Sequence, residues 1–320
     1  MRIARTAAIA AALVLLAPAV AAQEWPTRPI RFVVPFPAGG STDVAARVIG
    51  DRLSRALGQQ IVVENRTGAN GNLGVESVVK SAADGYTILV ATDSVASNPH
   101  VYKSTFDPLK DLTPVVELAR QPIALAAHSS LGARSLAELT ALAKQQPGMR
   151  FATGSGIGSP QAMVVLWFAK LAGVTMTQVP YRGGGQAIND LIAGHIKLGS
   201  LGSTPLIPHY KAGTLLLLAQ SMERRSPSLP EVPTFQEAGM KGLVVDQWIG
   251  VFVPAGTPAA IAARLNAEIN KALSDEQVRK SFTDQVQEPV GGTAERFAKV
   301  MVDDFQKYAR LVKELNIAAQ

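Results

Sequence analysis

Glycine-rich turns between strand-like and helix-like runs are the part of this sequence best suited to binding a ligand. Three of them read PFPAGGSTD (35–43), TGSGIGSPQ (153–161) and YRGGGQ (181–186). A helix N-terminus has unpaired N–H groups and a partial positive charge, and glycine lets the backbone approach a ligand closely. These turns therefore predict a site that holds an anion.

A nucleotide is a poor match for these turns. None of them has the Gly-Lys-Ser/Thr ending of a Walker loop. Gly154 and Gly156 begin a dinucleotide-like pattern, but Ser159 stands where the third glycine belongs. The next strand-like run ends at Tyr181 and Arg182, where a ribose-binding acid would be needed. The pattern favours a small anion without a nucleotide.

A catalytic serine is an alternative. Ser155 and Ser159 lie on a strand-to-helix turn, but Thr153 breaks the Gly-x-Ser-x-Gly pattern of a nucleophile elbow. The four histidines show neither the spacing of metal ligands nor a context that marks a general base. The chain has no cysteine, which excludes thiolate chemistry and cysteine metal sites. We therefore expect no metal and no cofactor, and hydroxyls that cap helices or bond a ligand.

Three charged residues beside the turns have two interpretations each. Asp43, in a first helical turn, would either complement the helix dipole or receive a cationic group of the ligand. Arg66 and Arg182 would either pair with ligand carboxylates or form salt bridges inside the fold.

Alternating strands and helices must position these turns. Most strand-like runs are continuously apolar, as in strands covered on both faces, which indicates an α/β fold with largely parallel sheets. The predicted strands are Ile30–Phe36, Ile61–Glu64, Thr87–Ala91, Ile123–Ala127, Arg150–Thr153, Thr177–Pro180, Leu215–Gln220 and Gln247–Val253.

The predicted helices have recognisable starts and apolar faces. Thr42–Leu57 has apolar residues at four-residue spacing, and Ser135 opens a capping box. Ser159 and Thr257 each precede a proline, which predicts a helix N-cap. A C-terminal helix has one apolar face, formed by Phe297, Met301, Phe305, Tyr308, Val312 and Leu315.

The chain contains two similar units. Each has a strand, a glycine-rich turn, a helix, a second strand and a second turn, and the second turn contains Arg66 or Arg182. Ligands of open α/β sheets bind beyond the carboxyl ends of the strands. Two such lobes facing each other would place four helix N-termini around one cleft.

The N-terminal residues and the charge indicate where the protein works. Arg2 and Arg5 precede an apolar run and a small-residue stretch, which predicts a signal peptide over residues 1–22, cleaved after Ala21 or Ala22. The remaining roughly 300 residues suit two domains. The net charge is +6, but the basic residues are dispersed without aromatic neighbours, which argues against binding of nucleic acid.

Several longer motifs follow one another along the chain after the signal peptide. They are WPTRPIRFVVPFPAGGSTDVAARVI, VVENRTGANGNLG, ADGYTILVAT, SNPHVY, VPYRGGGQAINDLIAGH, RSPSLPEVPTFQEAG and VFVPAGTPAAIAARLNAEINKAL. Taken together, they resemble the substrate-binding receptors of tripartite tricarboxylate transporters, the Bug family of bacterial periplasmic proteins, over essentially the whole chain after the signal peptide.

The resemblance implies a two-lobed periplasmic binding protein of a type II-like α/β fold, each lobe a mostly parallel sheet flanked by helices. We expect residues 23–121 with 247–320 to form one lobe and residues 122–246 the other. The protein would be a monomer that closes on a small organic carboxylate, performs no catalysis, and delivers the ligand to integral-membrane permease subunits. A sensor that reports its ligand to a signalling receptor is the alternative.

The resemblance also implies the ligand-binding residues. In many members a phenylalanine and an aspartate stand where this chain has Ser200 and Leu201, which leads us to expect a simple or aromatic carboxylate instead of an amino acid. The expected ligand-binding residues are Phe36, Ala38, Gly39, Gly40, Thr42, Asp43, Thr92, Ser94, Thr153, Ser155, Gly156, Ser159, Gln161, Tyr181, Gly184, Ser200 and Gly202.

Overall fold

The computed structural model describes residues 25–318, and the predicted signal peptide lies outside them. The described residues form a mixed sheet in which the strand order is β2-β1-β3-β9-β4-β7-β5-β6, while β8 and β10 pair with β4. The strands are β1 (Ile30–Val34), β2 (Ile61–Asn65), β3 (Thr87–Thr92), β4 (Leu112–His128), β5 (Met149–Thr153), β6 (Met176–Pro180), β7 (Leu198–Gly202), β8 (Leu215–Gln220), β9 (Asp246–Pro254) and β10 (Glu288–Pro289).

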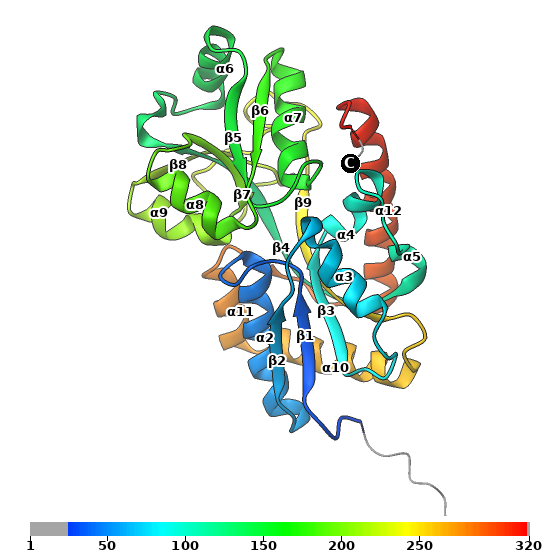
Figure 1. Cartoon of the computed structure of the whole chain (residues 1–320). Coiled ribbons are helices and arrows are strands. Elements are labelled where there is room, and N and C mark those ends of the chain that lie inside the picture. The colour runs from blue at the N-terminus through cyan, green and yellow to red at the C-terminus, as the bar shows by residue number, and fades with distance from the viewer. Residues whose placement is uncertain (1–24, 319–320) are drawn as a thin grey trace, which may run out of the picture.

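Helices lie on both sides of the sheet (Figure 1). They are α2 (Ser41–Leu57), α3 (Asn72–Val79), α4 (Ser94–Ser97), α5 (Pro108–Asp111), α6 (Leu136–Gln145), α7 (Pro160–Ala172), α8 (Gly184–Ile192), α9 (Ile207–Lys211), α10 (Ala259–Leu273), α11 (Glu276–Thr283) and α12 (Ala294–Glu314). Short 3-10 turns are η1 (Ala69–Gly71), η2 (Asn98–His100), η3 (Ser129–Leu131) and η4 (Thr204–Leu206). None of the helices within residues 25–318 combines the length and apolar character needed to cross a membrane.

The molecule has two halves, and Figure 1 shows how β4 and β9 run from one into the other. The first half contains β1, β2 and β3, with α2, α3, α10 and α11 around them. The second half contains β5 to β8 with α6 to α9. The strands β1, β2 and β3 are parallel to one another, as are β5, β6 and β7. The expected α/β fold is confirmed, although β4 and β9 pair antiparallel with each other and with their other neighbours.

The prediction for β4 was wrong in length. This strand begins at Leu112 and pairs with β9 as far as Pro122, and from Ile123 onward it pairs with β7. The polar run around Glu117, Arg120 and Gln121 hid the first part of the strand in the sequence. Glu117 is nevertheless buried, because the Arg120 guanidinium lies against its carboxylate at 2.5 Å.

Two further elements differ from expectation. The strand β7 was not predicted because two glycines and a serine weaken a strand signal. Gly202 is needed there, since a Cβ at this position would lie 2.7 Å from the Gln121 amide. The predicted N-cap at Thr257 is also wrong: its hydroxyl donates to the Pro254 carbonyl, and α10 begins only at Ala259.

The other predicted helix starts are confirmed. The Ser135 hydroxyl accepts from the Glu138 N–H at 3.1 Å, and the Ser159 hydroxyl accepts from the Ala162 N–H at 3.3 Å. The apolar face of α12 packs inward as its spacing predicted, with Phe297, Met301 and Tyr308 buried.

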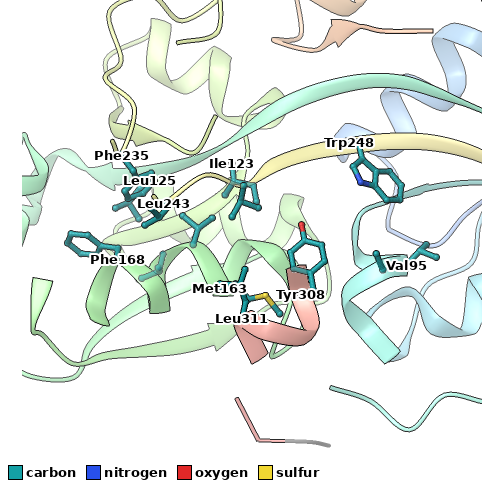
Figure 2. Packing of buried hydrophobic residues seen from close by; sticks show 14 of the residues in the cluster. Val95, Ile123, Leu125, Met163, Phe168, Phe235, Leu243, Trp248, Tyr308 and Leu311 are labelled. Atoms are coloured by element: carbon teal, nitrogen blue, oxygen red, sulfur yellow. The ribbon is translucent and has the colours of Figure 1, made fainter. Parts of the chain in front are cut away.

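One buried apolar cluster extends across both halves. Figure 2 shows Val95 of α4 and Trp248 of β9 in the same cluster as Met163 and Phe168 of α7, with Tyr308 of α12 among them. The far end of α12 also reaches the second half, where the Lys170 ammonium donates to the Glu314 carbonyl at 2.9 Å. Helix α12 therefore joins the two halves along one side.

A buried carboxyl group lies in this region. Asp93 is fully buried, accepts from the Tyr308 hydroxyl at 2.5 Å and lies 3.5 Å from the Gln247 amide nitrogen. Burial disfavours the charged form and raises the pKa of the Asp93 carboxyl to about 7, although the Tyr308 hydrogen bond opposes this shift.

The Asp93→Asn variant tests this pKa shift. Between about pH 4 and 7 the folded protein holds a proton at Asp93 that the unfolded chain releases. This contribution to stability is therefore full below about pH 4 and is lost as the pH rises through about 7. In urea unfolding, the free energy of unfolding of the wild type should fall by roughly 1–4 kcal/mol relative to that of Asp93→Asn between pH 4.5 and 7.5. Parallel pH profiles of the two proteins would contradict the assignment.

Candidate functional site

A small cavity lies where the two halves meet, beyond the carboxyl ends of β1 and β5. It encloses about 50 Å³. We call it the inner cavity. Among the described residues it is lined by Phe36, Pro37, Gly40, Ser41, Thr42, Thr92, Gly154, Ser155, Gln161, Gly184, Leu201, Gly202, Pro205 and Gln247.

Two helix N-termini open into the inner cavity without a side-chain cap. The N-caps of α2 and α8 are Gly40 and Gly183, and neither can cap its own helix with a side chain. The first residues of these helices, Ser41 and Gly184, line the cavity. The N–H groups of these first turns and the dipoles of α2 and α8 therefore supply positive potential from both halves.

Neutral polar side chains complete the inner cavity. Thr92 and Ser155 contribute hydroxyls, and Gln161 and Gln247 contribute amides. The Gln161 amide oxygen accepts from the Gly154 N–H at 2.9 Å, which leaves its NH₂ group to donate. Within residues 25–318, no side chain that lines this cavity carries a charge. The arrangement suits an anion held by backbone dipoles and hydroxyls.

Asp43 is used inside the first half. It does not line the inner cavity, and its side chain is 4% exposed. Its carboxylate accepts from the Gly39 N–H at 2.9 Å, from Arg47 at 3.0 Å and from the Asn65 amide at 2.9 Å. Burial alone would raise the pKa of the Asp43 carboxyl, but these hydrogen bonds hold it below its ordinary value. The carboxylate therefore fixes the PFPAGGSTD turn onto α2.

Several other predicted residues form hydrogen bonds to residues that line the inner cavity. The Thr153 hydroxyl donates to the Ser155 carbonyl at 2.6 Å, and the Ser200 hydroxyl donates to the Gln161 carbonyl at 2.7 Å. Ser94 exchanges a hydrogen bond with Thr92 at 3.0 Å. The predicted residues that do not line the inner cavity are Ala38, Gly39, Asp43, Ser94, Thr153, Gly156, Ser159, Tyr181 and Ser200.

A second cavity of about 450 Å³ adjoins the first and shares Phe36, Gly154 and Ser155 with it. We call it the outer cavity. Two more of the predicted residues, Gly156 and Tyr181, lie in its wall. Its other lining residues are Pro35, Thr67, Gly68, Ala69, Asn70, Gly71, Pro180 and Arg182.

The two halves touch each other beside these cavities. The Gly156 N–H donates to the Asn70 amide oxygen at 2.7 Å, and the Tyr102 hydroxyl donates to the Ile157 carbonyl at 2.7 Å. A Cβ placed on Gly183 would lie 2.5 Å from the Pro37 ring. The two halves are therefore in direct contact beside the inner cavity.

Sequence reasoning missed six residues of the inner cavity. Gly154 lies inside a turn that had been singled out, and Ser41 directly follows the glycines of another. Leu201 stood out only as a departure from the family pattern. Pro37 also lies inside the first of these turns, whereas no sequence signal marked Pro205 or Gln247, which reach the cavity through tertiary packing.

The serine-hydrolase alternative lacks a nucleophile–base pair here. Ser159 caps α7, and no histidine within residues 25–318 hydrogen-bonds to Ser155 or Ser159. The Nε2 atom of His100 instead forms a hydrogen bond with the Phe305 carbonyl.

Comparisons with known proteins agree with this architecture. The sequence model described as the tripartite tricarboxylate transporter family receptor matches residues 45–317. Protein BugT of Bordetella pertussis (strain Tohama I) is 36% identical over 302 residues, which covers 93% of each chain. The structure of R. palustris Rpa4515 with adipate has a TM-score of 0.89 at 33% identity, covering 93% of this chain and 100% of that one.

A second solved structure is also similar. MatC (Rpa3494) from Rhodopseudomonas palustris with bound malate has a TM-score of 0.84 at 31% identity, covering 90% of this chain and 100% of that one. The matching family is described as a transporter receptor, and the two solved structures are described with adipate and with bound malate.

The structural role of Asp43 is tested by Asp43→Ala, with Asp51→Ala as the matched control. Both carboxylates pair with an arginine four residues later in α2, but the Asp51 side chain is 74% exposed. Asp43→Ala removes three partly buried hydrogen bonds and should lower the free energy of unfolding by about 2–3 kcal/mol, whereas Asp51→Ala should cost less than about 0.5 kcal/mol. The measurement is urea unfolding at pH 7.

The cost of Asp43→Ala should shrink as the pH falls through the pKa of the folded-state carboxyl, because a lowered pKa stabilises the fold only while the group is ionised. Equal stabilities of the two variants at pH 7 would rule out this role for Asp43.

Proposed function

This chain belongs to the family of tripartite tricarboxylate transporter receptors, and on that premise we propose that it is a periplasmic solute-binding protein for a small organic carboxylate. The protein binds the ligand without turnover and hands it to the integral-membrane permease subunits of a tripartite transporter. It acts as a monomer and uses no cofactor.

The observation that carries this proposal is the pair of uncapped helix N-termini facing one cavity that no charged side chain lines among the described residues. A carboxylate there receives hydrogen bonds from the first turns of α2 and α8 and is stabilised by both helix dipoles. Such a site avoids the desolvation of a buried basic side chain. It suits binding that has to be reversed at the permease.

The structural neighbours support a carboxylate ligand. The Rpa4515 structure is described with adipate and the MatC structure with bound malate, and both share the fold of this chain. Leu201 lines the inner cavity and offers no carboxylate that could pair with a ligand amine. We therefore expect a carboxylate without an α-amino group.

Closure of two lobes is the proposed mechanism. Residues 23–121 with 247–320 form one lobe and residues 122–246 the other, so the chain crosses between them in β4 and at the start of β9. A ligand that contacts both Ser41 of α2 and Gly184 of α8 bridges the lobes and shifts the population towards the closed state. The contacts of α12 with α7 restrict opening on one side, which favours a hinge motion that opens the opposite side.

A binding screen tests the proposed function. The purified protein is unfolded, refolded to remove any carried ligand, and tested by thermal shift against mono-, di- and tricarboxylates, aromatic acids and amino acids. A carboxylate at 100 times its Kd stabilises the fold by about 2.7 kcal/mol, so its melting temperature should rise by a few degrees. The matching methyl esters or amides should have no effect. A folded protein that responds to no carboxylate would refute the proposal.

The closure mechanism is tested by Gly183→Ala, with Gly185→Ala as the control. The added methyl group at position 183 meets Pro37 of the other lobe only when the cleft is shut, while a Cβ at position 185 has no atom within 4 Å. Gly183→Ala should weaken binding of the carboxylate by about 5- to 150-fold, as expected for a contact costing about 1–3 kcal/mol. Isothermal titration calorimetry measures the affinities. Wild-type affinity in Gly183→Ala would show that binding does not need this closed arrangement.

A further inference from the structure

We propose that Asp93 links ligand binding to the uptake of a proton. The inner cavity binds its carboxylate tightly while Asp93 is protonated and weakly once Asp93 is ionised, so a rise in pH favours release of the ligand. This inference rests on the proposed function, because it assumes that a carboxylate occupies the inner cavity.

Two residues that line the inner cavity connect it to Asp93. Thr92 precedes Asp93 in the chain at the end of β3, and Gln247 lies on the neighbouring strand β9. The Gln247 amide nitrogen is 3.5 Å from Oδ1 of Asp93. Asp93 itself is fully buried and does not line the cavity. A change of charge at Asp93 therefore acts on the ligand across Gln247, without direct contact.

The hydrogen bonds of Gln247 fix the direction of its amide group. Its oxygen accepts from the Gln121 amide at 2.7 Å, so its NH₂ group is the end that faces Asp93. An NH₂ group can donate two hydrogen bonds, which allows Gln247 to donate one to Asp93 and the other to a ligand oxygen. With an ordinary hydrogen bond of about 2.9 Å, that ligand oxygen would lie about 6 Å from Oδ1 of Asp93.

An ionised Asp93 disfavours an anion at this distance. Two unit charges about 6 Å apart, in a medium of effective dielectric constant about 20, weaken each other's binding by roughly 100-fold. The ionised carboxylate also holds the Gln247 NH₂ group more strongly than the neutral acid does, which competes with donation to the ligand. Protonation of Asp93 removes the repulsion and weakens this competition.

The Asp93 carboxyl exchanges its proton near neutral pH. Burial raises the pKa of this carboxyl to about 7. The hydrogen bond from the Tyr308 hydroxyl opposes the rise in pKa, repulsion from Asp304 adds to it, and attraction to Lys307 opposes it. A carboxylate in the inner cavity raises the pKa of Asp93 further, since each negative charge disfavours the other. Binding at a pH slightly above this pKa therefore draws a proton onto Asp93.

The charged groups around Asp93 do not pair with it. On α12, Lys307 pairs with Asp304 at 2.6 Å, and Arg120 of β4 lies 3.4 Å from Asp246 of β9. Helix α4, which follows Asp93, has no charged residue. Within residues 25–318, no ion pair includes Asp93. The ionised form is therefore a buried negative charge without a counter-ion, so its repulsion reaches the cavity.

Histidines are the other side chains that ordinarily titrate near neutral pH. His100 of η2 forms a hydrogen bond with the Phe305 carbonyl of α12 at 2.8 Å, and burial lowers its pKa. The other three histidines lie in the second half. None of the four lines the inner cavity, which leaves Asp93 as the group that connects a proton to the ligand.

Isothermal titration calorimetry of four refolded proteins tests the inference. The proteins are the wild type, Asp93→Asn, Tyr308→Phe and Asp246→Asn, and the probes are adipate, malate, benzoate and citrate. Affinities are measured at several pH values from about 6 to 8.5. Titrations near pH 8 are repeated in HEPES and in Tris, because the difference in buffer ionisation enthalpy gives the number of protons taken up. Subtraction of the Asp93→Asn result removes any proton that the acid itself binds.

Asp246→Asn is the matched control. Burial raises the pKa of Asp246 as well, but its carboxylate lies against Arg120 and does not line the inner cavity. This variant should keep the pH dependence of the wild type, which separates the effect of Asp93 from a general loss of negative charge.

A coupling of about 10- to 100-fold should make the wild type bind at least one acid about 7- to 25-fold more tightly near pH 6 than near pH 8.5, with uptake of roughly 0.4–0.8 of a proton per ligand near pH 8. Asp93→Asn should keep the low-pH affinity over the whole range. Tyr308→Phe should move the loss of affinity to higher pH, because it removes the hydrogen bond that lowers the pKa of Asp93. A purely structural role of the tyrosine would leave that pH unchanged.

Two results would overturn the inference while the proposed function stands. One is binding to the wild type without proton uptake and with the same affinity across the pH range, a measurement that needs no variant to fold. The other is a folded Asp93→Asn variant with the pH dependence of the wild type. If none of the four acids binds any of the folded proteins at any pH, the proposed function is refuted, and the inference with it.

Discussion

The antiparallel pairing of β4 with β9 is the constraint on which the rest of the structure depends. These two strands pair from Leu112 opposite Pro254 to Pro122 opposite Asp246, with a register shift between Pro114 and Val116 and another between Glu117 and Ala119. Beyond that point β4 continues into the second half and pairs with β7 and β8. Both parallel groups of strands are therefore attached to one pair of strands, and the ends of α2 and α8 are brought to opposite sides of one cleft.

Polar groups are buried where this pairing crosses between the halves. Gln121 and Gln247 face each other across β4 and β9, with a side-chain hydrogen bond of 2.7 Å. Thr204 and Gln287 extend this network towards α2, since the Gln287 amide donates to the Ser41 carbonyl at 2.9 Å and to the Thr204 hydroxyl at 3.0 Å. Because Gln247 also lines the inner cavity, the wall of the site is part of the crossing.

The sequence predicted the local features of this site well and the distant ones poorly. Ser159 and Ser135 cap their helices as expected, because a cap needs only the residues next to it. Ser200 was expected at the ligand, but its hydroxyl points to the Gln161 carbonyl. Nothing in the sequence shows which face of β7 meets the cavity. The first eleven residues of β4 and the whole of β7 escaped prediction. Glu117 is buried through its ion pair with Arg120 of the same strand, and Gly202 is required by Gln121 and Gln247 of neighbouring strands.

The sequence by itself determined the α/β alternation, the glycine turns and the family resemblance, since propensity, capping and backbone freedom act over a few neighbouring residues. Only the tertiary structure decided that Asp43 serves its own turn, that Leu201 and Gln247 line the inner cavity, and that Arg182 faces the outer one. These outcomes depend on which side chains from the two halves meet across the cleft. That meeting is fixed by the register of β4 and β9, which short-range patterns in the chain do not encode.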